Sequence, residues 1–145
     1  MAVLITFERT SKSIQFKPVI RKLIRELIVE EEKELGEISI IFTSNEHILE
    51  INRTFLNHHY FTDVITFPDS KRDKISGDIY ISLDEVRKNA RRYNSTFNDE
   101  VTRVVIHGIL HLIGYDDVTP DQKIIIRKKE DSYLSRFKRF DFIVK

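Results

Sequence analysis

The feature that most constrains the fold of this chain is a helix expected over residues 101–112, with Thr96 or Asn98 as its N-cap. Its apolar residues fall on nearly all sides rather than on one stripe: Val101, Val104, Val105, Ile106, Ile109, Leu110 and Leu112. Such a helix is stable only when other elements surround it, so we place it at the centre of the molecule. It also carries His107 and His111, which are therefore held on the most rigid element available.

The two histidines have a spacing typical of a metal site. Residues four apart lie roughly 40° apart around a helix, so both rings point the same way and their nitrogens can close on one ion at about 2.0–2.1 Å. Gly114 can end the helix in the left-handed conformation, and the chain can then bring Asp116 or Asp117 back over the rings. The pattern H-x-x-x-H-x-x-G-x-x-D thus predicts two helical ligands, a hinge and a third ligand, the alternative being hydrogen-bonded core histidines.

The residue types available restrict the chemistry of this site. The chain has no cysteine, so a zinc ion would depend on histidine, carboxylate and water. Two histidines and one carboxylate leave a coordination position for water or substrate, which favours hydrolysis. Zinc peptidases place a glutamate base directly after the first histidine, whereas this chain has Gly108 there, which argues against peptide hydrolysis.

The remaining elements alternate along the chain. Strands are expected at residues 3–7, 37–43, 64–67 and 77–82, and further helices from residue 17 up to Gly36 and at 44–56, 82–93 and 121–136. In the last helix, Ile124, Ile125 and Leu134 are expected to face inward. This order predicts a single α+β domain over residues 1–145: a small, mixed four-stranded sheet packed against helices, zincin-like, with the histidine-bearing helix buried at its centre.

The charged residues are unevenly distributed, although the net charge is only +1. Basic residues gather at 71–72, 87–92, 127–129 and 136–139, and they form either solvated helix faces or a surface that contacts nucleic acid. No apolar run approaches the roughly 20 residues that span a bilayer, and residues 1–9 do not look like a secretory leader. We therefore expect a cytoplasmic protein that is not in a membrane.

Three segments together resemble the YbeY family. They are residues 62–68 (TDVITFP), 77–82 (GDIYIS) and 107–117 (HGILHLIGYDD), and the likeness extends over about residues 38–117. Members of that family are single-domain, metal-dependent endoribonucleases linked to small-subunit ribosomal RNA maturation and ribosome quality control in bacteria. The resemblance implies an α+β fold, one zinc ion and single-stranded RNA as substrate, with ribosomal proteins as further partners.

Two positions depart from the family pattern. Asp117 stands where the motif usually has a third histidine; aspartate can bind zinc, but its charge makes the ion a weaker Lewis acid. Leu56 stands where the family has an arginine that clamps phosphate, and a leucine cannot do this. Either a neighbouring cation replaces it (Arg53, His58, His59 or Arg103), or catalysis is weaker than the resemblance implies.

The resemblance also assigns roles to individual residues. His107, His111 and Asp117 would bind the metal and, with Asp63, form the catalytic group, while Asp116 would orient a histidine or its own turn. The substrate-binding residues would be Thr62, Arg53, His58 and Arg103, and basic residues of the last two helices would follow the RNA backbone. The other metals that suit these ligands are nickel, manganese and iron. The alternative function is a non-catalytic, zinc-containing ribosome-assembly factor that binds RNA or a ribosomal protein.

Overall fold

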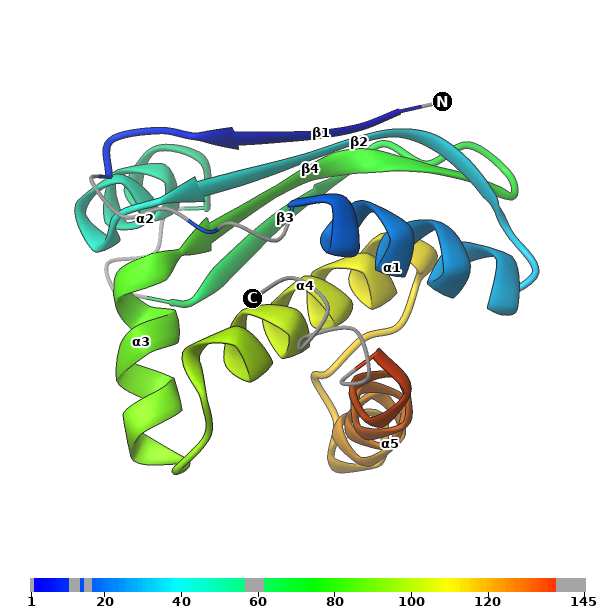
Figure 1. Ribbon diagram of the computed structural model, residues 1–145. Coiled ribbons are helices and arrows are strands. Elements are labelled where there is room, and N and C mark those ends of the chain that lie inside the picture. The colour runs from blue at the N-terminus through cyan, green and yellow to red at the C-terminus, as the bar shows by residue number, and fades with distance from the viewer. Residues whose placement is uncertain (1, 11–13, 15–16, 57–61, 138–145) are drawn as a thin grey trace.

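The computed structural model describes residues 2–10, 14, 17–56 and 62–137 (Figure 1). In chain order its elements are β1 (Ala2–Phe7), α1 (Lys17–Glu30), β2 (Glu34–Thr43), α2 (Asn45–Ile51), the π-helical turn η1 (Asn52–Leu56), β3 (Val64–Pro68), β4 (Lys74–Ser82), α3 (Leu83–Arg92), α4 (Phe97–Ile113) and α5 (Pro120–Phe137). In the part of the chain described, no helix is both long and apolar enough to cross a lipid bilayer.

The four strands form one mixed sheet in the order β1-β2-β4-β3. β1 and β4 both pair with β2 in parallel, while β3 pairs with β4 antiparallel. Ile5, Ile40 and Ile79 stand side by side across three strands, and all three are buried. The predicted α+β fold with a small, mixed four-stranded sheet is confirmed.

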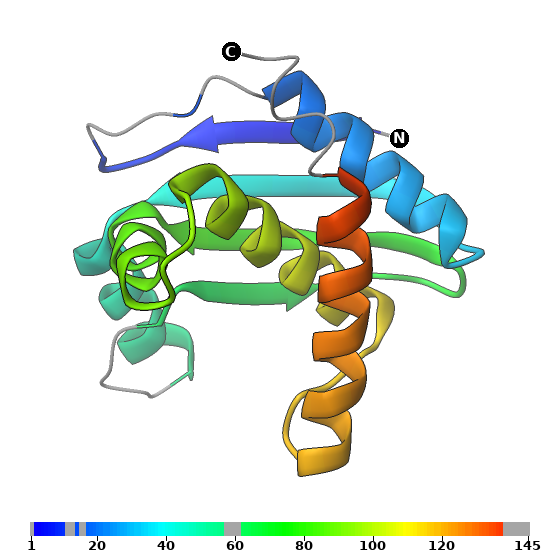
Figure 2. The same cartoon turned by 60° about the horizontal axis from the view of Figure 1, so that its bottom comes forward.

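Helix α4 lies at the centre of the molecule, as the sequence predicted. It runs beneath the sheet beside α1, and α5 crosses it on the side away from the sheet (Figures 1 and 2). Gly108 faces β4 so closely that a Cβ atom there would lie 2.9 Å from Cγ2 of Ile79. The peptidase base absent from the sequence could not be presented from this position, because it points into the sheet rather than toward solvent.

A second, smaller hydrophobic cluster lies on the opposite face of the sheet. Side chains alternate between the two faces of a strand, so Tyr80 points away from α4 when its neighbour Ile79 points toward it. Ile65 pairs with Tyr80, and it packs with Ile48 and Ile51 of α2. The short helix α2 therefore covers the outer face near β3, while the main core fills the other face.

Two predicted boundaries were wrong: the end of the first helix and the start of the fourth strand. The helix α1 ends at Glu30 rather than at Gly36, because Gly36 lies within β2, where a Cβ atom would meet Oγ of Ser76 at 2.1 Å. The glycine thus permits close packing against β4 instead of ending a helix. Similarly, β4 begins at Lys74, three residues earlier than expected, because it pairs with the start of β2.

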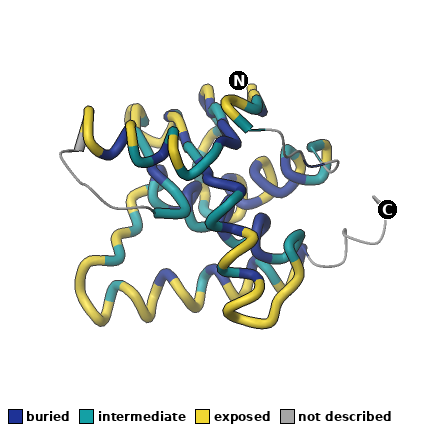
Figure 3. The backbone as a smooth tube through the Cα atoms, turned by 90° about the vertical axis from the view of Figure 1, so that its left-hand side faces the viewer, coloured by how far each residue is buried: buried dark blue, intermediate teal, exposed yellow. Residues whose placement is uncertain are grey.

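The inward face of α5 also differs from the prediction. Ile124 and Ile125 are 55% and 52% exposed, and Leu134 is only partly buried against the core. Most of α5 is exposed along its length (Figure 3), and its buried residues are Ile126, Glu130, Tyr133 and Phe137. Three consecutive isoleucines at 124–126 do not define which side of a helix faces inward, whereas the true buried stripe contains an acid. That acid belongs to the site described below.

Candidate metal centre

Three potential metal ligands converge at the C-terminal end of α4. The Nε2 atoms of His107 and His111 are 2.9 Å apart, and Oδ2 of Asp117 lies 3.4 Å from the first and 3.5 Å from the second. Gly114 permits this approach: at φ 124° it ends the helix, and the following residues fold back over the rings. In the described part of the chain, this is the one group of three or more side chains with metal-ligating atoms so close together.

The separations fit a tetrahedral ion. Bonds of about 2.0–2.1 Å to zinc place neighbouring ligand atoms about 3.3 Å apart, and the three observed distances lie on either side of this value. The side chains are 19–40% exposed, so one side of the group faces solvent. The arrangement therefore suits a cation that also takes a ligand from solution.

Glu130 fixes the orientation of the His107 ring from the neighbouring helix. Nδ1 of His107 lies 2.5 Å from Oε2 of Glu130, whose side chain is only 6% exposed. When Nδ1–H donates to this carboxylate, Nε2 keeps its lone pair for an ion. The sequence analysis expects Asp116 to orient a histidine or its own turn; Asp116 is exposed, and the carboxylate that contacts Nδ1 of His107 is that of Glu130.

Arg103 in turn holds Glu130. Its Nη1 lies 3.3 Å from Oε1 of Glu130, and its Nη2 lies 2.8 Å from Oδ1 of Asp131. The guanidinium therefore links α4 to α5 and neutralises part of the negative charge beside the histidines. A chain of contacts runs from Arg103 through Glu130 to His107.

The surroundings of His107 are strongly negative. Burial alone would lower the pKa of its imidazole, but the hydrogen bond and charge of Glu130, together with the charges of Asp117 and Asp63, raise it above the ordinary value. Carboxylates that favour a proton on this ring also favour a metal cation beside it.

Asp63 lies just before β3 in the same cavity as His107. Burial is the main cause that raises the pKa of this carboxyl group, with the charges of Glu85 and Glu130 adding to the effect and His107 opposing it. Nδ2 of Asn89 is 3.4 Å from Oδ2 of Asp63 and donates a long hydrogen bond. The group is thus partly desolvated and is held near the candidate ligands.

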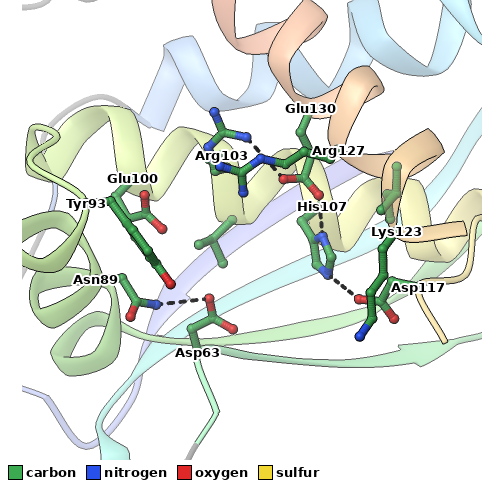
Figure 4. Close-up of a pocket in the computed structure, with 12 residues that line it drawn as sticks. Asp63, Asn89, Tyr93, Glu100, Arg103, His107, Asp117, Lys123, Arg127 and Glu130 are labelled. Atoms are coloured by element: carbon green, nitrogen blue, oxygen red, sulfur yellow. Dashed lines mark hydrogen bonds and ion pairs between the residues drawn. The ribbon is translucent and has the colours of Figure 1, made fainter. Parts of the chain in front are cut away.

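A cavity of about 340 Å³ joins these groups (Figure 4). It is lined by Asp63, Asn89, Tyr93, Glu100, Arg103, Val104, His107, Asp117, Lys123, Ile126, Arg127 and Glu130. Most of these residues come from α3, α4 and α5. Two exposed cations of α5, Lys123 and Arg127, face the cavity beside the acidic groups.

The predicted substrate-binding residues are less well gathered than the metal ligands. Arg103 lines the cavity, but two carboxylates already occupy its guanidinium. Thr62 donates a long hydrogen bond from Oγ1 to the Val64 carbonyl, and Arg53 is exposed on η1; neither lines the cavity. His58 and His59 lie outside the described residues.

Sequence reasoning missed Glu130, Lys123, Tyr93 and Glu100. A signal existed for Glu130, since it stands in the stripe 126/130/133/137, where every other member is apolar. An acid in a buried stripe must have a partner, and that is a sequence-level indication of a site. The other three carry no comparable pattern, because only the packing of α3, α4 and α5 brings them to one cavity.

Comparison with known proteins gives a consistent result. A family model described as Endoribonuclease YbeY matches residues 5–138. The chain is 43% identical over 132 residues to Endoribonuclease YbeY of Chlorobaculum parvum, covering 91% of this chain and 93% of the relative. It is 48% identical over 103 residues to Endoribonuclease YbeY of Bacteroides thetaiotaomicron, covering 71% and 75% of the two chains.

A solved structure agrees with these matches. The solution structure of TM1509 from Thermotoga maritima is similar to this fold with a TM-score of 0.68 and 30% sequence identity, covering 94% of this chain and 89% of the other. The segment matched by the family model contains the whole sheet from residue 5 onward, the central helix and the turn to Asp117. The chain therefore belongs to the YbeY endoribonuclease family.

Proposed function

We propose that this protein is a metal-dependent endoribonuclease that cleaves single-stranded RNA, with ribosomal RNA as its natural substrate. Its role would be maturation of the 3′ end of small-subunit ribosomal RNA and ribosome quality control in the cytoplasm, with ribosomal proteins as further partners. The observation that carries the proposal is the convergence of His107, His111 and Asp117 beside a cavity that also presents cations. Membership of an endoribonuclease family supports the same reaction class.

The proposed metal site uses the three converging side chains, and zinc is the ion that we expect. A divalent cation there would lower the pKa of a water molecule and polarise a phosphoryl oxygen. Nickel, manganese and iron also accept imidazole and carboxylate, so metal analysis belongs to the test. Glu130 keeps the His107 ring in the orientation and tautomer that binding requires.

We assign Asp63 the role of proton acceptor. The nucleophile is either water or the RNA 2′-hydroxyl, and it must lose a proton as it attacks phosphorus. A carboxyl group whose pKa is raised by burial is a better base than an exposed one and can also return the proton to the leaving oxygen. Thr62, the preceding residue, would help to place this carboxyl group at the cavity.

The RNA backbone would follow the basic residues of α5. Lys123 and Arg127 are exposed at the cavity and are suited to bind phosphate groups beside the cleaved bond. Arg103 would act in substrate binding mainly through its contact with Glu130, whereas Arg53 would meet RNA outside the cavity. A substrate contact by His58 stays a prediction.

The test combines metal content with cleavage. Freshly purified wild-type protein should contain about one zinc ion per chain and cleave a labelled single-stranded RNA, whereas His107→Ala and His111→Ala should lose both properties. His47→Ala is the matched control, because this histidine contacts Thr43 and Tyr80 on the outer face of the sheet. Equal cleavage by wild type and His107→Ala would indicate a contaminating nuclease and contradict the proposal.

A non-catalytic assembly factor is the second candidate, and one observation favours it. The cation nearest to His107 on α4, Arg103, is bound by two carboxylates and is not free to clamp phosphate. Leu56 also stands where the family pattern has arginine. This candidate predicts that the metal-loaded protein binds RNA but leaves it intact under conditions in which a nuclease would cleave it.

A further inference from the structure

The cavity at the metal centre continues into a second cavity of about 220 Å³. The two share Tyr93, Glu100, Arg103 and Arg127, so they form one groove between α3, α4 and α5. The metal ligands stand at one end of this groove. A single-stranded chain with its phosphate at the metal end would place a neighbouring nucleotide in the second cavity.

Glu100 is the unexplained group in this groove. The residue is only 6% exposed, yet its side chain faces both cavities, and no hydrogen bond reaches its carboxylate from any described residue. Burial raises the pKa of the Glu100 carboxyl group. The charge of Arg103 lowers this pKa, although the two side chains make no ion-pair contact. No side-chain oxygen that is fully enclosed among the described residues lacks a hydrogen-bond partner, so the Glu100 carboxylate must open onto the groove, where it can accept hydrogen bonds from a ligand.

Tyr93 supplies an exposed aromatic ring next to this carboxylate. It follows the last residue of α3, it is 64% exposed, and it lies beside Glu100 over the groove (Figure 4). Exposed tyrosines on a nucleic-acid path commonly stack on unpaired bases. The Tyr93 ring can therefore stack on the face of a flat ligand, while the Glu100 carboxylate accepts hydrogen bonds from its edge.

We propose that Tyr93 and Glu100 form a subsite for a guanine base, in the nucleotide next to the phosphodiester that is cleaved; this inference rests on the proposed ribonuclease function. An ionised carboxylate has acceptors only. Guanine is the RNA base whose Watson–Crick edge carries two adjacent donors, N1–H and the N2 amino group. Adenine and cytosine offer one amino group beside an acceptor, and uracil has one N–H between two carbonyl oxygens.

The test is a positional scan of short oligouridine substrates in which one position at a time carries guanine, adenine or cytosine. Wild-type protein should cleave most efficiently with guanine at one fixed position beside the cut, by about tenfold over the other bases. Glu100→Gln should lose this preference and cleave the substrates with adenine or cytosine at that position more efficiently than the wild type does. The reason is that an amide offers a donor group and an acceptor, which match the edges of these two bases. Glu26→Gln, an exposed substitution on α1, is the matched control and should keep the guanine preference.

The ring is tested separately. Tyr93→Ala should weaken binding of every oligonucleotide by about tenfold whatever its base, since stacking does not depend on the edge groups. Tyr93→Phe should bind almost as the wild type does. A base preference that survives Glu100→Gln, or uniform cleavage of the whole series, would overturn the guanine subsite.

The subsite and the nuclease function can fail independently. The same series with 2′-O-methyl nucleotides is measured by fluorescence anisotropy, which needs no cleavage. If RNA is bound with a guanine preference that depends on Glu100 but is never cut, the subsite stands and the nuclease proposal falls. If RNA is cut by the wild type and not by His107→Ala, but without base preference in either assay, the subsite alone is wrong.

Discussion

At the scale of single residues, the proposed metal centre includes a contact from a carboxylate that is distant in sequence. Glu130 lies 23 residues beyond His107 and still makes the contact that sets its ring. Helix periodicity predicted the two histidines, because a spacing of four is a local property. No local property predicts that a residue of α5 meets His107, since this contact depends on how α5 crosses α4.

Removing the Glu130 carboxylate should weaken metal binding. We expect Glu130→Gln to lower zinc affinity by about tenfold to a hundredfold, because an uncharged amide is a weaker acceptor than the carboxylate and can instead turn its NH2 group toward Nδ1 of His107. Competition with a chromophoric chelator measures this affinity. Asp131→Asn is the control: it weakens one of the two carboxylate contacts of Arg103 and leaves the Arg103–Glu130 and Glu130–His107 contacts in place. Equal affinities for Glu130→Gln and wild type would mean that the contact does not serve the metal.

At the scale of elements, a buried carboxylate ties three segments together. Oε1 of Glu31, just after α1, accepts a 2.6 Å hydrogen bond from the Tyr115 hydroxyl, which lies between Gly114 and the Asp117 turn. Lys129 and Tyr133 of α5 bind its other oxygen, with Nζ of Lys129 at 3.0 Å. The cluster therefore anchors the segment that carries Asp117, the proposed third metal ligand.

The Glu31 cluster should make stability depend on pH. Burial would raise the pKa of Glu31, but the hydrogen bonds from Tyr115, Tyr133 and Lys129 outweigh it and lower the pKa. A folded-state pKa below the unfolded value stabilises the fold above the unfolded pKa, and this contribution is lost as pH falls through the folded value. Glu31→Gln should thus lower the free energy of unfolding at pH 7 by about 1–3 kcal/mol, and by less in acid.

Urea unfolding at pH 7 and at pH 4 measures this difference. Glu32→Gln is the matched control, because this substitution removes the same formal charge at the adjacent position, where the side chain is exposed. If Glu31→Gln lowers the free energy of unfolding by the same amount at both pH values, the charge of the Glu31 carboxylate does not contribute to the cluster.

The same elements show what sequence patterns can and cannot predict. α4 was placed correctly because a helix apolar on all sides has only one stable location. The predicted buried face of α5 was wrong, because it was based on Ile124 and Ile125, which are exposed. The observed buried face includes Glu130. Gly36 was read as a helix end because the acidic residues around it show neither helical nor strand period.

At the scale of the whole molecule, the near-zero net charge does not show where the charged residues lie. The chain carries +1 overall, and its cavity is lined by acids as well as by two exposed cations of α5, Lys123 and Arg127. Binding of RNA through such residues releases counterions and weakens as salt increases. The distribution of charge therefore matters more for RNA binding than its sum.

The salt dependence of RNA binding should show whether Lys123 and Arg127 contact phosphate groups. Lys123→Ala and Arg127→Ala should each reduce the slope of log K against log salt concentration by about 0.7, the contribution of one phosphate contact on a single strand. Anisotropy titrations between low and moderate salt give the slope. Lys71→Ala, outside the groove on the β3–β4 connection, should leave it unchanged. Identical slopes for all three variants would place the RNA elsewhere.

The position of α4 has a consequence for how an ion would be released. Two candidate ligands, His107 and His111, lie on the helix at the centre of the molecule, while Asp117 and Glu130 lie on the segment that packs against this helix from outside. Detaching this segment, from the turn at Asp117 through α5, would remove one of the three candidate ligands and the carboxylate that contacts His107. It would also expose Ile126, Tyr133 and Phe137, which belong to the main core. A bound cation would therefore tie α4 to this outer segment, and its binding would stabilise the packing of α5 against the core.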